Sequence, residues 1–518
     1  MAFAINRSQP IDRNLDLDIS SNKTYRSTGT IYYVLFLVTY FLILIYLANR
    51  LYIWEDEGYS LHTSSHNLKE VIRLSYNFEG QPPFYFVLLS LWRNINASIF
   101  FARLMSIACI GSAAYFFYRL TSLITNRVDN YWTVILFLLN PFTVWAGMEI
   151  RLYALVILLS TSASYYFLLY YLNEKNKYLY ILLVITLIGL YTQYFIAFLI
   201  AAFGLSLLIF KGWKRFLNFC LHFIPVLILF LPNFVYVPQQ LSMAQTHLDV
   251  NIENLFDVIR TPQDFLLALN TLKLNQALRW IIKIPFILLF VVAIFRLILL
   301  EKPLDSVYFK VLKVIFLTVI FCLILFATLI PALSLIFMEK YMFIIFPLLL
   351  LFYSLFKTFK WRIWIYTSIS IYFISLLVIK YQYPEKTYNF EKVSKFLKRV
   401  QFKNEPIIFY GKSILPPFQF YYSGNNPLYT LPKLNYDKDY YEERIKDTTD
   451  FKRELDAINS NSSSYLLVTE SISGYKYKET LTREMIQQLL RNHYQISLDT
   501  TFYSRNSINF LRIQRLEK

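Results

Sequence analysis

Long apolar runs recur along the chain and alternate with short polar stretches. A helix needs roughly 17–25 mostly apolar residues to cross the hydrocarbon core of a bilayer. Eleven runs approach that length, at 31–49, 99–118, 131–146, 152–172, 178–193, 194–210, 217–237, 280–300, 311–330, 341–356 and 363–379. The pattern predicts an α-helical polytopic membrane protein with about 11 transmembrane helices.

One further apolar stretch, PPFYFVLLSLW at 82–92, is too short to be a twelfth span. At 1.5 Å per residue it covers about 16 Å, roughly half of a bilayer core. We expect it to form a re-entrant or interfacial helix.

Composition supports a membrane protein, because 56% of the 518 residues are apolar and 19% are aromatic. The formal net charge of +17 is better explained by cytoplasmic loops than by nucleic-acid binding. The three cysteines all lie in apolar runs, so no disulfide framework is visible.

Lys and Arg positions predict the orientation of the chain in a plasma (inner) membrane. If the N-terminus is cytoplasmic, every inside turn carries at least two cations, whereas the short outside turns carry few. Treating 82–92 as a crossing would reverse this bias. The C-terminus is then predicted to be extracytoplasmic.

The same pattern divides the chain into three parts. Residues 1–30 are a cytoplasmic segment, and residues 31–380 form the transmembrane domain with an outer loop at 50–98. Residues 381–518 are polar and predict a small extracytoplasmic α/β domain. Within it we expect helices at 391–400 and 481–494, strands at 405–411 and 464–470, and an edge or final strand at 507–516.

Two acidic segments lie in the first outer loop. Glu55, Asp56 and Glu57 directly follow the first span, where carboxylates are costly unless they meet water or a partner. The alternative is a solvated acidic cap on a juxtamembrane helix. Glu79 precedes Pro82 and Pro83, and its alternative role is to cap the helix that the prolines begin.

Three more polar segments lie at predicted outer turns. Glu149 and Arg151 share one turn, and their alternative is a simple ion pair with each other. Glu339 and Lys340 precede another run. The segment YTQYF at 191–195 is best explained as interfacial anchoring.

The charge-based topology places all five segments on one face of the membrane. A carboxylate there can accept a proton from an incoming hydroxyl or amine. Arg and Lys can neutralise a phosphate leaving group where little water is present. Together they indicate group transfer from a phosphate-activated lipid to an acceptor outside the cell.

Five segments in order resemble the motifs of GT-C class membrane glycosyltransferases, family 39, which includes protein O-mannosyltransferases and the aminoarabinose transferases that modify lipid A. They are DEGYSLHTSS, EGQPPFYFVLLSLW, NPFTVWAGMEIRLYALVILL, YTQYFIAF and EKYMFIIFPLLLL, and they span about residues 31–356. The resemblance implies a GT-C-like fold and an inverting transfer of a sugar from a polyprenyl-phosphate donor. The acceptor would be a lipid, a glycan or a protein of the cell envelope.

The resemblance also assigns roles to residues. Asp56 falls on the family's catalytic acid and would be the general base. Glu57, Glu79 and Glu149 are further catalytic candidates. Arg151 and Lys340 would meet the donor phosphate, accompanied by Tyr153 and Tyr341.

The chain departs from the family pattern at three positions. Gln81 stands where His or Lys is usual, Gln193 replaces a His, and Lys340 replaces an Arg. Lys340 keeps the charge but loses the bidentate fork of Arg. No cofactor is required. Some members use a divalent cation, which Asp56 with Glu149 could hold, but no spacing in the sequence indicates a metal site.

Two other functional classes remain open from the sequence. A transporter or flippase for a lipid-linked or anionic substrate would also use ionisable residues near the membrane, although paired repeats and midplane sites are typical of that class. An assembly scaffold that uses the tail as a binding module is the second alternative. Substitution of Asp56 would leave a scaffold working.

Overall fold

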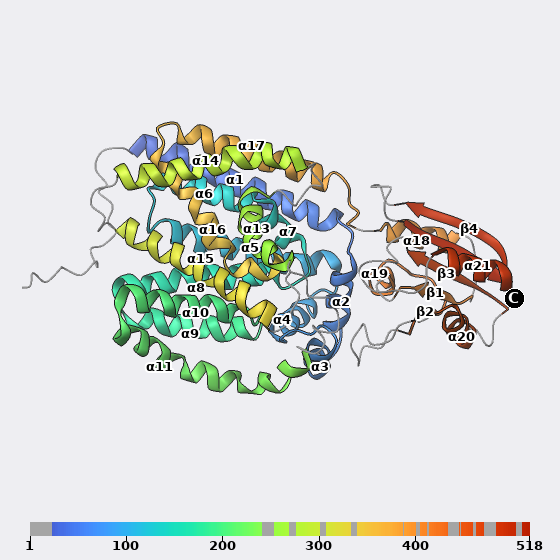
Figure 1. Cartoon of the computed structure of the whole chain (residues 1–518). Helices are drawn as coiled ribbons and strands as arrows, with labels where there is room; N and C mark the ends of the chain where they lie inside the picture. The colour runs from blue at the N-terminus through green and yellow to red at the C-terminus, as the bar shows by residue number, and fades with distance from the viewer. Residues whose placement is uncertain are drawn as a thin grey trace, which may run out of the picture.

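The computed structural model describes residues 23–240, 253–268, 276–300, 307–332, 339–386, 388–399, 405–411, 414–433, 445, 447–458, 463–470, 483–503 and 510–517. These residues form a bundle of roughly parallel helices with a small α/β domain beyond one end (Figure 1). The predicted fold class, a helical membrane domain followed by a C-terminal α/β domain, is confirmed. We call the end of the bundle that meets the C-terminal domain the domain end.

The bundle comprises α1 (Lys23–Arg50), α2 (Glu55–Thr63), α3 (Leu68–Asn77), α4 (Phe84–Arg93), α5 (Ile99–Thr121), α6 (Arg127–Leu139), α7 (Pro141–Met148), α8 (Tyr153–Asn173), α9 (Asn176–Leu190), α10 (Ile196–Lys211), α11 (Trp213–Phe230), η1 (Leu231–Val235), α13 (Glu253–Leu267), α14 (Gln276–Leu300), α15 (Val307–Ala332), η3 (Glu339–Ile344), α16 (Phe346–Leu350), η4 (Leu351–Thr358) and α17 (Arg362–Tyr381).

By length and composition, six helices of the described chain can cross a membrane, or seven if the bent pair α6–α7 is one span. Other apolar helices, α9 and α10 among them, are shorter. The count of eleven spans and the sidedness therefore remain predictions. Helix α4, in the 82–92 stretch, has only 10 residues, as expected for a segment too short to cross the bilayer alone.

Three predicted runs do not form single α-helices. The run 217–237 leaves α11 at Phe230 and continues as the 3-10 helix η1. The run 131–146 is divided into α6 and α7, which are bent by 54°. Pro141 cannot donate a backbone hydrogen bond to continue α6, and the Asn140 side chain accepts from the Phe142 N–H at 2.9 Å to begin α7. The run 341–356 is divided among η3, α16 and η4.

Helix α8 occupies the interior of the bundle, and its sequence explains how it fits there. Residues 160–164 read STSAS and are all buried. Small side chains let neighbouring helices approach closely, which is how helices associate where lipid removes the hydrophobic drive. The hydroxyls are satisfied within the helix; Ser164, for example, donates to the Ser160 carbonyl at 2.7 Å.

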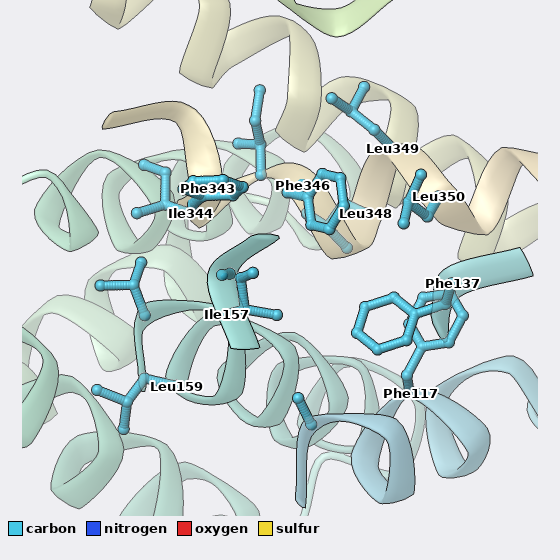
Figure 2. Close-up of a cluster of buried hydrophobic side chains, with 14 of the residues drawn as sticks. Phe117, Phe137, Ile157, Leu159, Phe343, Ile344, Phe346, Leu348, Leu349 and Leu350 are labelled. Atoms are coloured by element: carbon cyan, nitrogen blue, oxygen red, sulfur yellow. The ribbon is translucent and has the colours of Figure 1, made fainter. Parts of the chain in front are cut away.

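Aromatic rings complete the interior around α8 (Figure 2). The Phe117 and Phe137 rings stack with centroids 4.4 Å apart. Phe343 stacks on Phe265 at 5.3 Å and meets Phe346 edge to face. These ring contacts pack the broken segment 339–358 against the rest of the bundle.

The outer helices expose apolar side chains instead. Leu42 on α1, Ile228 on α11 and Val378 on α17 are each at least 58% exposed. Apolar surface of this extent on several helices is the expected face toward lipid.

The C-terminal domain contains α18 (Phe390–Arg399), β1 (Ile407–Tyr410), α19 (Leu415–Gln419), β2 (Leu428–Leu431), α20 (Thr448–Ile458), β3 (Ser464–Glu470), α21 (Arg483–His493), β4 (Gln495–Tyr503) and β5 (Phe510–Glu517). The sheet order is β2-β1-β3-β5-β4, with β1 parallel to both neighbours and β5 antiparallel to both of its neighbours.

All five elements predicted in the tail are present. Of the two alternatives for the last segment, β5 is the final strand and not an edge strand, because it lies between β3 and β4. Strand β4 was not expected. Its exposed and half-buried residues give no apolar run, so only pairing with β5 defines it.

The C-terminal domain rests directly on α2 at the domain end. Tyr421 accepts a hydrogen bond from the Ile53 N–H at 2.8 Å, and the Tyr52 hydroxyl donates to Glu391 at 2.6 Å. Gly58 lies against α19 so closely that an added Cβ would be 2.7 Å from the Pro417 nitrogen. Glycine is therefore required where α2 and α19 meet.

We expect Gly58→Ala to destabilise the protein by about 1–3 kcal/mol, as overpacking of a tight contact does. The lower unfolding temperature of the purified protein in detergent would show it. Gly29→Ala is the matched control, because no atom lies within 4 Å of a Cβ at that position. Equal unfolding temperatures for the two variants would contradict the tight α2–α19 contact.

Candidate active site

Helix α2 presents three consecutive carboxylates in its first turn. Negative charge is favourable there, because the first backbone N–H groups of a helix are unpaired. Glu57 also accepts from the Trp54 N–H at 3.3 Å, which fixes the start of the helix. Successive side chains on a helix point about 100° apart. Glu55, Asp56 and Glu57 therefore face different surroundings.

Asp56 faces two cations from distant parts of the chain. Its Oδ2 lies 3.3 Å from Lys340 Nζ and 3.9 Å from Arg151 Nε. Arg151 also donates to Glu79 Oε2 at 2.6 Å and to the Ser60 hydroxyl at 2.9 Å. The site thus contains two carboxylates joined by one guanidinium, with the ammonium of Lys340 beside Asp56.

Exposure shows which side of this group is accessible. The side chains of Arg151 and Glu79 are only 7% and 3% exposed, whereas those of Asp56 and Lys340 are 22% and 27% exposed. A molecule can therefore reach the Asp56–Lys340 edge. The buried Arg151–Glu79 pair lies beneath this edge and supports it.

The charges of the neighbouring side chains determine whether Asp56 is protonated. Burial acts to raise its pKa, but the positive charges of Lys340 and Arg151 outweigh burial and hold the pKa below its ordinary value. Asp56 is therefore a carboxylate at neutral pH.

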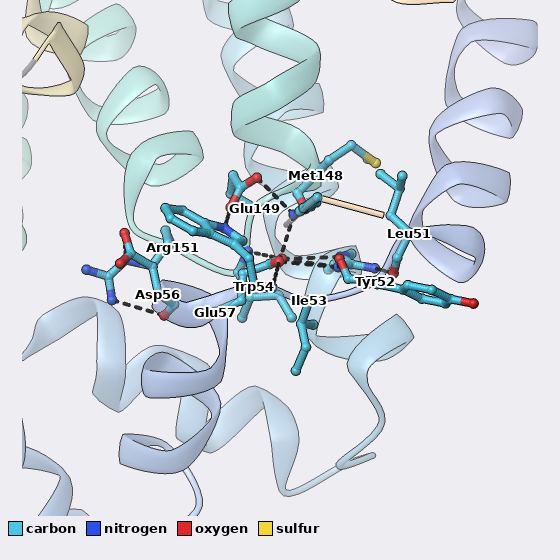
Figure 3. A network of polar contacts seen from close by, with 12 residues as sticks. Leu51, Tyr52, Ile53, Trp54, Asp56, Glu57, Met148, Glu149 and Arg151 are labelled. Carbon is cyan, nitrogen blue, oxygen red and sulfur yellow. Dashed lines mark hydrogen bonds and ion pairs between the residues drawn. The ribbon is translucent and has the colours of Figure 1, made fainter. Parts of the chain in front are cut away.

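Glu57 points the other way, into the protein (Figure 3). Glu57 and Arg103 are both fully buried, and Arg103 Nη2 lies 3.3 Å from Glu57 Oε1. Lys386 Nζ lies 2.7 Å from Glu57 Oε2 and 2.8 Å from Glu149 Oε1. The indole N–H of Trp54 donates to Glu149 Oε2 at 2.5 Å. Two buried carboxylates are thus held by two cations and an indole.

Arg103 has a second task, because it also binds the backbone at the end of α1. Its guanidinium donates to the carbonyls of Ala48, Leu51 and Tyr52, the first and last at 3.0 Å. It therefore fixes the link from α1 into α2, and with it the direction of the acidic turn.

Glu55 faces the C-terminal domain. Burial, then the charges of Asp56 and Glu470, raise its pKa to about 8. The Tyr59 hydroxyl donates to Glu55 at 3.0 Å. At neutral pH the protonated form predominates, so Asp56 is the accessible charged acid of the first turn.

Tyr153 and Tyr341 accompany Lys340 as the resemblance implies. Lys340 Nζ lies 5.4 Å from the centroid of the Tyr153 ring, a cation–π arrangement. The Tyr341 ring lies 4.6 Å from that of Phe195. The 191–195 turn therefore packs beside the cations.

The structure overturns three alternative readings of these acids. Glu57 is buried and Asp56 is paired with Lys340 and Arg151, so these two acids do not act as a purely solvated cap. Glu79 binds Arg151 and makes no side-chain cap on α4. In the described chain Glu149 pairs with Lys386, and Arg151 pairs with Glu79 and Asp56, so the turn does not form its own ion pair.

Sequence reasoning missed Arg103, Lys386 and Trp54 as members of the network. Arg103 carried a usable signal, since an ionisable residue inside an apolar run usually has a functional partner. Lys386 carried none, because it is one of many lysines in a polar segment. The described residues contain no cluster of three or more His, Cys, Asp or Glu side chains arranged to hold a metal.

We expect Lys386→Met to destabilise the protein strongly, by about 3–5 kcal/mol, because it leaves two buried carboxylates short of a cation. Thermal unfolding in detergent measures the loss, and Lys386→Arg should lose less. Lys395→Met is the control, because that side chain is 65% exposed and its ion pair contributes little. Similar losses for Lys386→Met and Lys395→Met would contradict the network.

We expect Glu55 to make stability depend on pH. The carboxyl stays protonated up to about pH 8 in the folded state but ionises near its ordinary value of 4.5 when unfolded. Unfolding therefore releases a proton in between, and stability falls as pH rises from about 4.5 to 8. Glu55→Gln should remove that part of the decline in unfolding temperature. Glu70→Gln, at an exposed carboxylate whose pKa is lowered by its bond to Arg73, should not.

Part of the chain matches one family model, and the whole chain is similar in fold to solved structures. Residues 80–236 match the family model described as dolichyl-phosphate-mannose-protein mannosyltransferase. The matched segment contains Glu149, Arg151 and Tyr153, whereas Asp56 and Lys340 lie outside it. No curated protein matches the chain in sequence.

Among solved structures, ArnT from Cupriavidus metallidurans in the apo state is similar over 94% of this chain and 98% of that chain, with a TM-score of 0.61 and 10% identity. ArnT from the same organism bound to undecaprenyl phosphate is similar over 93% and 98%, with a TM-score of 0.46 and 10% identity. The family-model match, together with the fold shared with apo ArnT, confirms the resemblance to family 39-like GT-C membrane glycosyltransferases that the sequence motifs indicate.

Proposed function

We propose that this chain is a multi-pass glycosyltransferase of the plasma membrane. It moves a sugar from a polyprenyl-phosphate donor to an acceptor on the extracytoplasmic face, with Asp56 as general base. The observation that carries the proposal is the position of Asp56 Oδ2, within 4 Å of both Lys340 Nζ and Arg151 Nε at an accessible edge. The matched family model, whose description names a dolichyl-phosphate sugar, supports the class of donor.

The proposed reaction follows from these charges. The acceptor oxygen bonds to the anomeric carbon of the sugar, and the bond from that carbon to the phosphate oxygen breaks. The electron pair leaves with the polyprenyl phosphate, whose charge Arg151 and Lys340 stabilise. The proton of the acceptor hydroxyl passes to Asp56. Attack opposite the leaving group inverts the anomeric centre.

Donor binding would also make Asp56 a better base. In the free site Lys340 and Arg151 hold the pKa of Asp56 low, so the carboxylate binds a proton weakly. A phosphate that binds the same two cations would weaken their hold on Asp56. Its pKa would then rise toward the range in which a carboxylate accepts a proton effectively. The donor thus activates the base that the acceptor needs.

The neighbouring residues have supporting roles in this proposal. Glu79 holds Arg151 in place, and Tyr153 does the same for Lys340. Glu57 and Glu149, with Arg103 and Lys386, fix α2 rather than contact the donor. A transporter is disfavoured, because the accessible charges of the site, Asp56 on α2 and Lys340 on η3, meet at the domain end instead of near the middle of the bundle.

We expect Asp56→Asn to lower sugar transfer by about 10²–10⁴-fold, the usual contribution of a general base. Purified protein in lipid nanodiscs would be given a panel of polyprenyl-phosphate sugars, and donor consumption measured. Binding of bare polyprenyl phosphate should be unchanged or tighter, because Asn no longer competes for the two cations.

Asp499→Asn, at a β4 position paired with Arg512 far from α2, is the matched control and should transfer at the wild-type rate. Transfer by Asp56→Asn at that rate would rule out the general base. Loss of both transfer and lipid binding, with unfolding at a lower temperature, would assign Asp56 a structural role instead.

A further inference from the structure

A second group of polar side chains, outside the charged site and buried or half-buried, has buried atoms left unpaired. In the described part of the chain, five polar atoms close to the loop that follows α3 have no hydrogen-bond partner. They are Gln81 Oε1, Gln193 Oε1, Tyr194 Oη, Asn233 Nδ2 and Gln240 Oε1. We call these five residues the amide cluster. Asn233 is fully buried, and Gln193 and Gln240 are each only 8% exposed.

The segments that carry the amide cluster touch one another. The Tyr76 hydroxyl donates to Asn233 Oδ1 at 2.6 Å, and Gln240 Nε2 donates to the Tyr76 carbonyl at 3.2 Å. The loop that holds Gln81 leads to Phe84, whose N–H donates to the Tyr191 carbonyl at 2.9 Å, next to Gln193. Tyr194 meets the Phe230 ring at 5.9 Å, just before η1.

The amide cluster also adjoins the charged site at two points. Gln81 follows Glu79, the ligand of Arg151, by two residues. On the other side, the 191–195 turn brings Phe195 against Tyr341, the neighbour of Lys340. The amide cluster therefore lies on segments that directly adjoin the residues of the charged site.

The chemistry of the free atoms is that of hydroxyl recognition. A buried polar atom without a partner destabilises a protein, so several together in a folded protein call for an occupant. Amide oxygens accept hydrogen bonds, Asn233 Nδ2 donates, and the tyrosine hydroxyl does both. Sugar hydroxyls also donate and accept. None of the five side chains is charged.

The geometry points to the amide cluster as a subsite for the sugar of the donor, and to a neutral, hydroxyl-bearing sugar as its occupant. The inference rests on the proposed function and adds the class of sugar. The two departures noted in the sequence fit it. Gln81 and Gln193 stand where family members carry Lys or His, so both changes make this part of the site neutral. An amino or carboxylated sugar would find no opposite charge among the five.

The test compares binding of three ligands to wild-type protein in nanodiscs: bare polyprenyl phosphate, a polyprenyl-phosphate hexose and a polyprenyl-phosphate amino sugar. We expect the hexose donor to bind at least tenfold more tightly than the bare lipid, and more tightly than the amino-sugar donor. Equal affinity for hexose donor and bare lipid, or a preference for the amino sugar, would overturn the inference.

Variants then locate the effect. Gln81→Met and Gln193→Met should each reduce the tenfold advantage of the hexose donor while affinity for the bare lipid stays unchanged. Their unfolding temperatures should not fall, since each change removes an unpaired buried acceptor. Gln419→Met, at an exposed position on α19, is the control and should behave as wild type.

Other outcomes separate the two proposals. If wild-type protein binds neither the bare lipid nor the donors, the proposed function fails and the subsite with it. If it binds the bare lipid but gains nothing from the sugar, only the subsite fails. If the variants lose bare-lipid affinity as well, the amide cluster serves the phosphate, and if no affinity changes, water fills it. Both of these results overturn the inference.

Discussion

Burial of Glu57 beside Arg103 is the interaction on which the rest of the site depends. A buried carboxylate is tolerated only with a cation and further hydrogen bonds, and Arg103 supplies both while it also binds the carbonyls that end α1. Because α2 begins only a few residues later, this pair fixes the direction of the first turn of α2. Asp56, one residue before Glu57, is then directed toward Arg151 and Lys340.

The C-terminal domain is part of the same arrangement rather than an attached module. Lys386, in the link between α17 and the domain, joins Glu57 to Glu149. Tyr421 and α19, both in the C-terminal domain, contact the beginning of α2. A change in the seating of the domain would therefore reach Asp56 through α2. This gives the tail a positional role, since the ion-pair partners of Asp56 among the described residues are Lys340 and Arg151 of the bundle.

The proposed donor site has two regions, one charged and one neutral. Arg151 and Lys340 suit a phosphate, and their own pairing with Asp56 and Glu79 keeps them in position before a donor arrives. The amide cluster beside them has no charge and several free hydrogen-bonding atoms, which suits sugar hydroxyls. The same departures from the family pattern that leave the phosphate with fewer cations leave the sugar with neutral contacts. In this proposal, different side chains recognise the phosphate and the sugar of the donor.

The helical membrane class, the α/β tail and the side chains of the accessible candidate site could all be predicted from the residue pattern. The length of an apolar run directly indicates a membrane-spanning helix. Asp56, Glu79, Arg151 and Lys340 stand out because an ionisable side chain beside such a segment needs water or a partner. The ion-pair partner of each charged side chain could be read only from the folded chain. Glu149 and Arg151 are two residues apart yet bind different partners, and Lys386 reaches Glu57 across more than 300 residues. The place of β5 inside the sheet was likewise settled by packing, because local sequence does not encode which distant segment lies next to it.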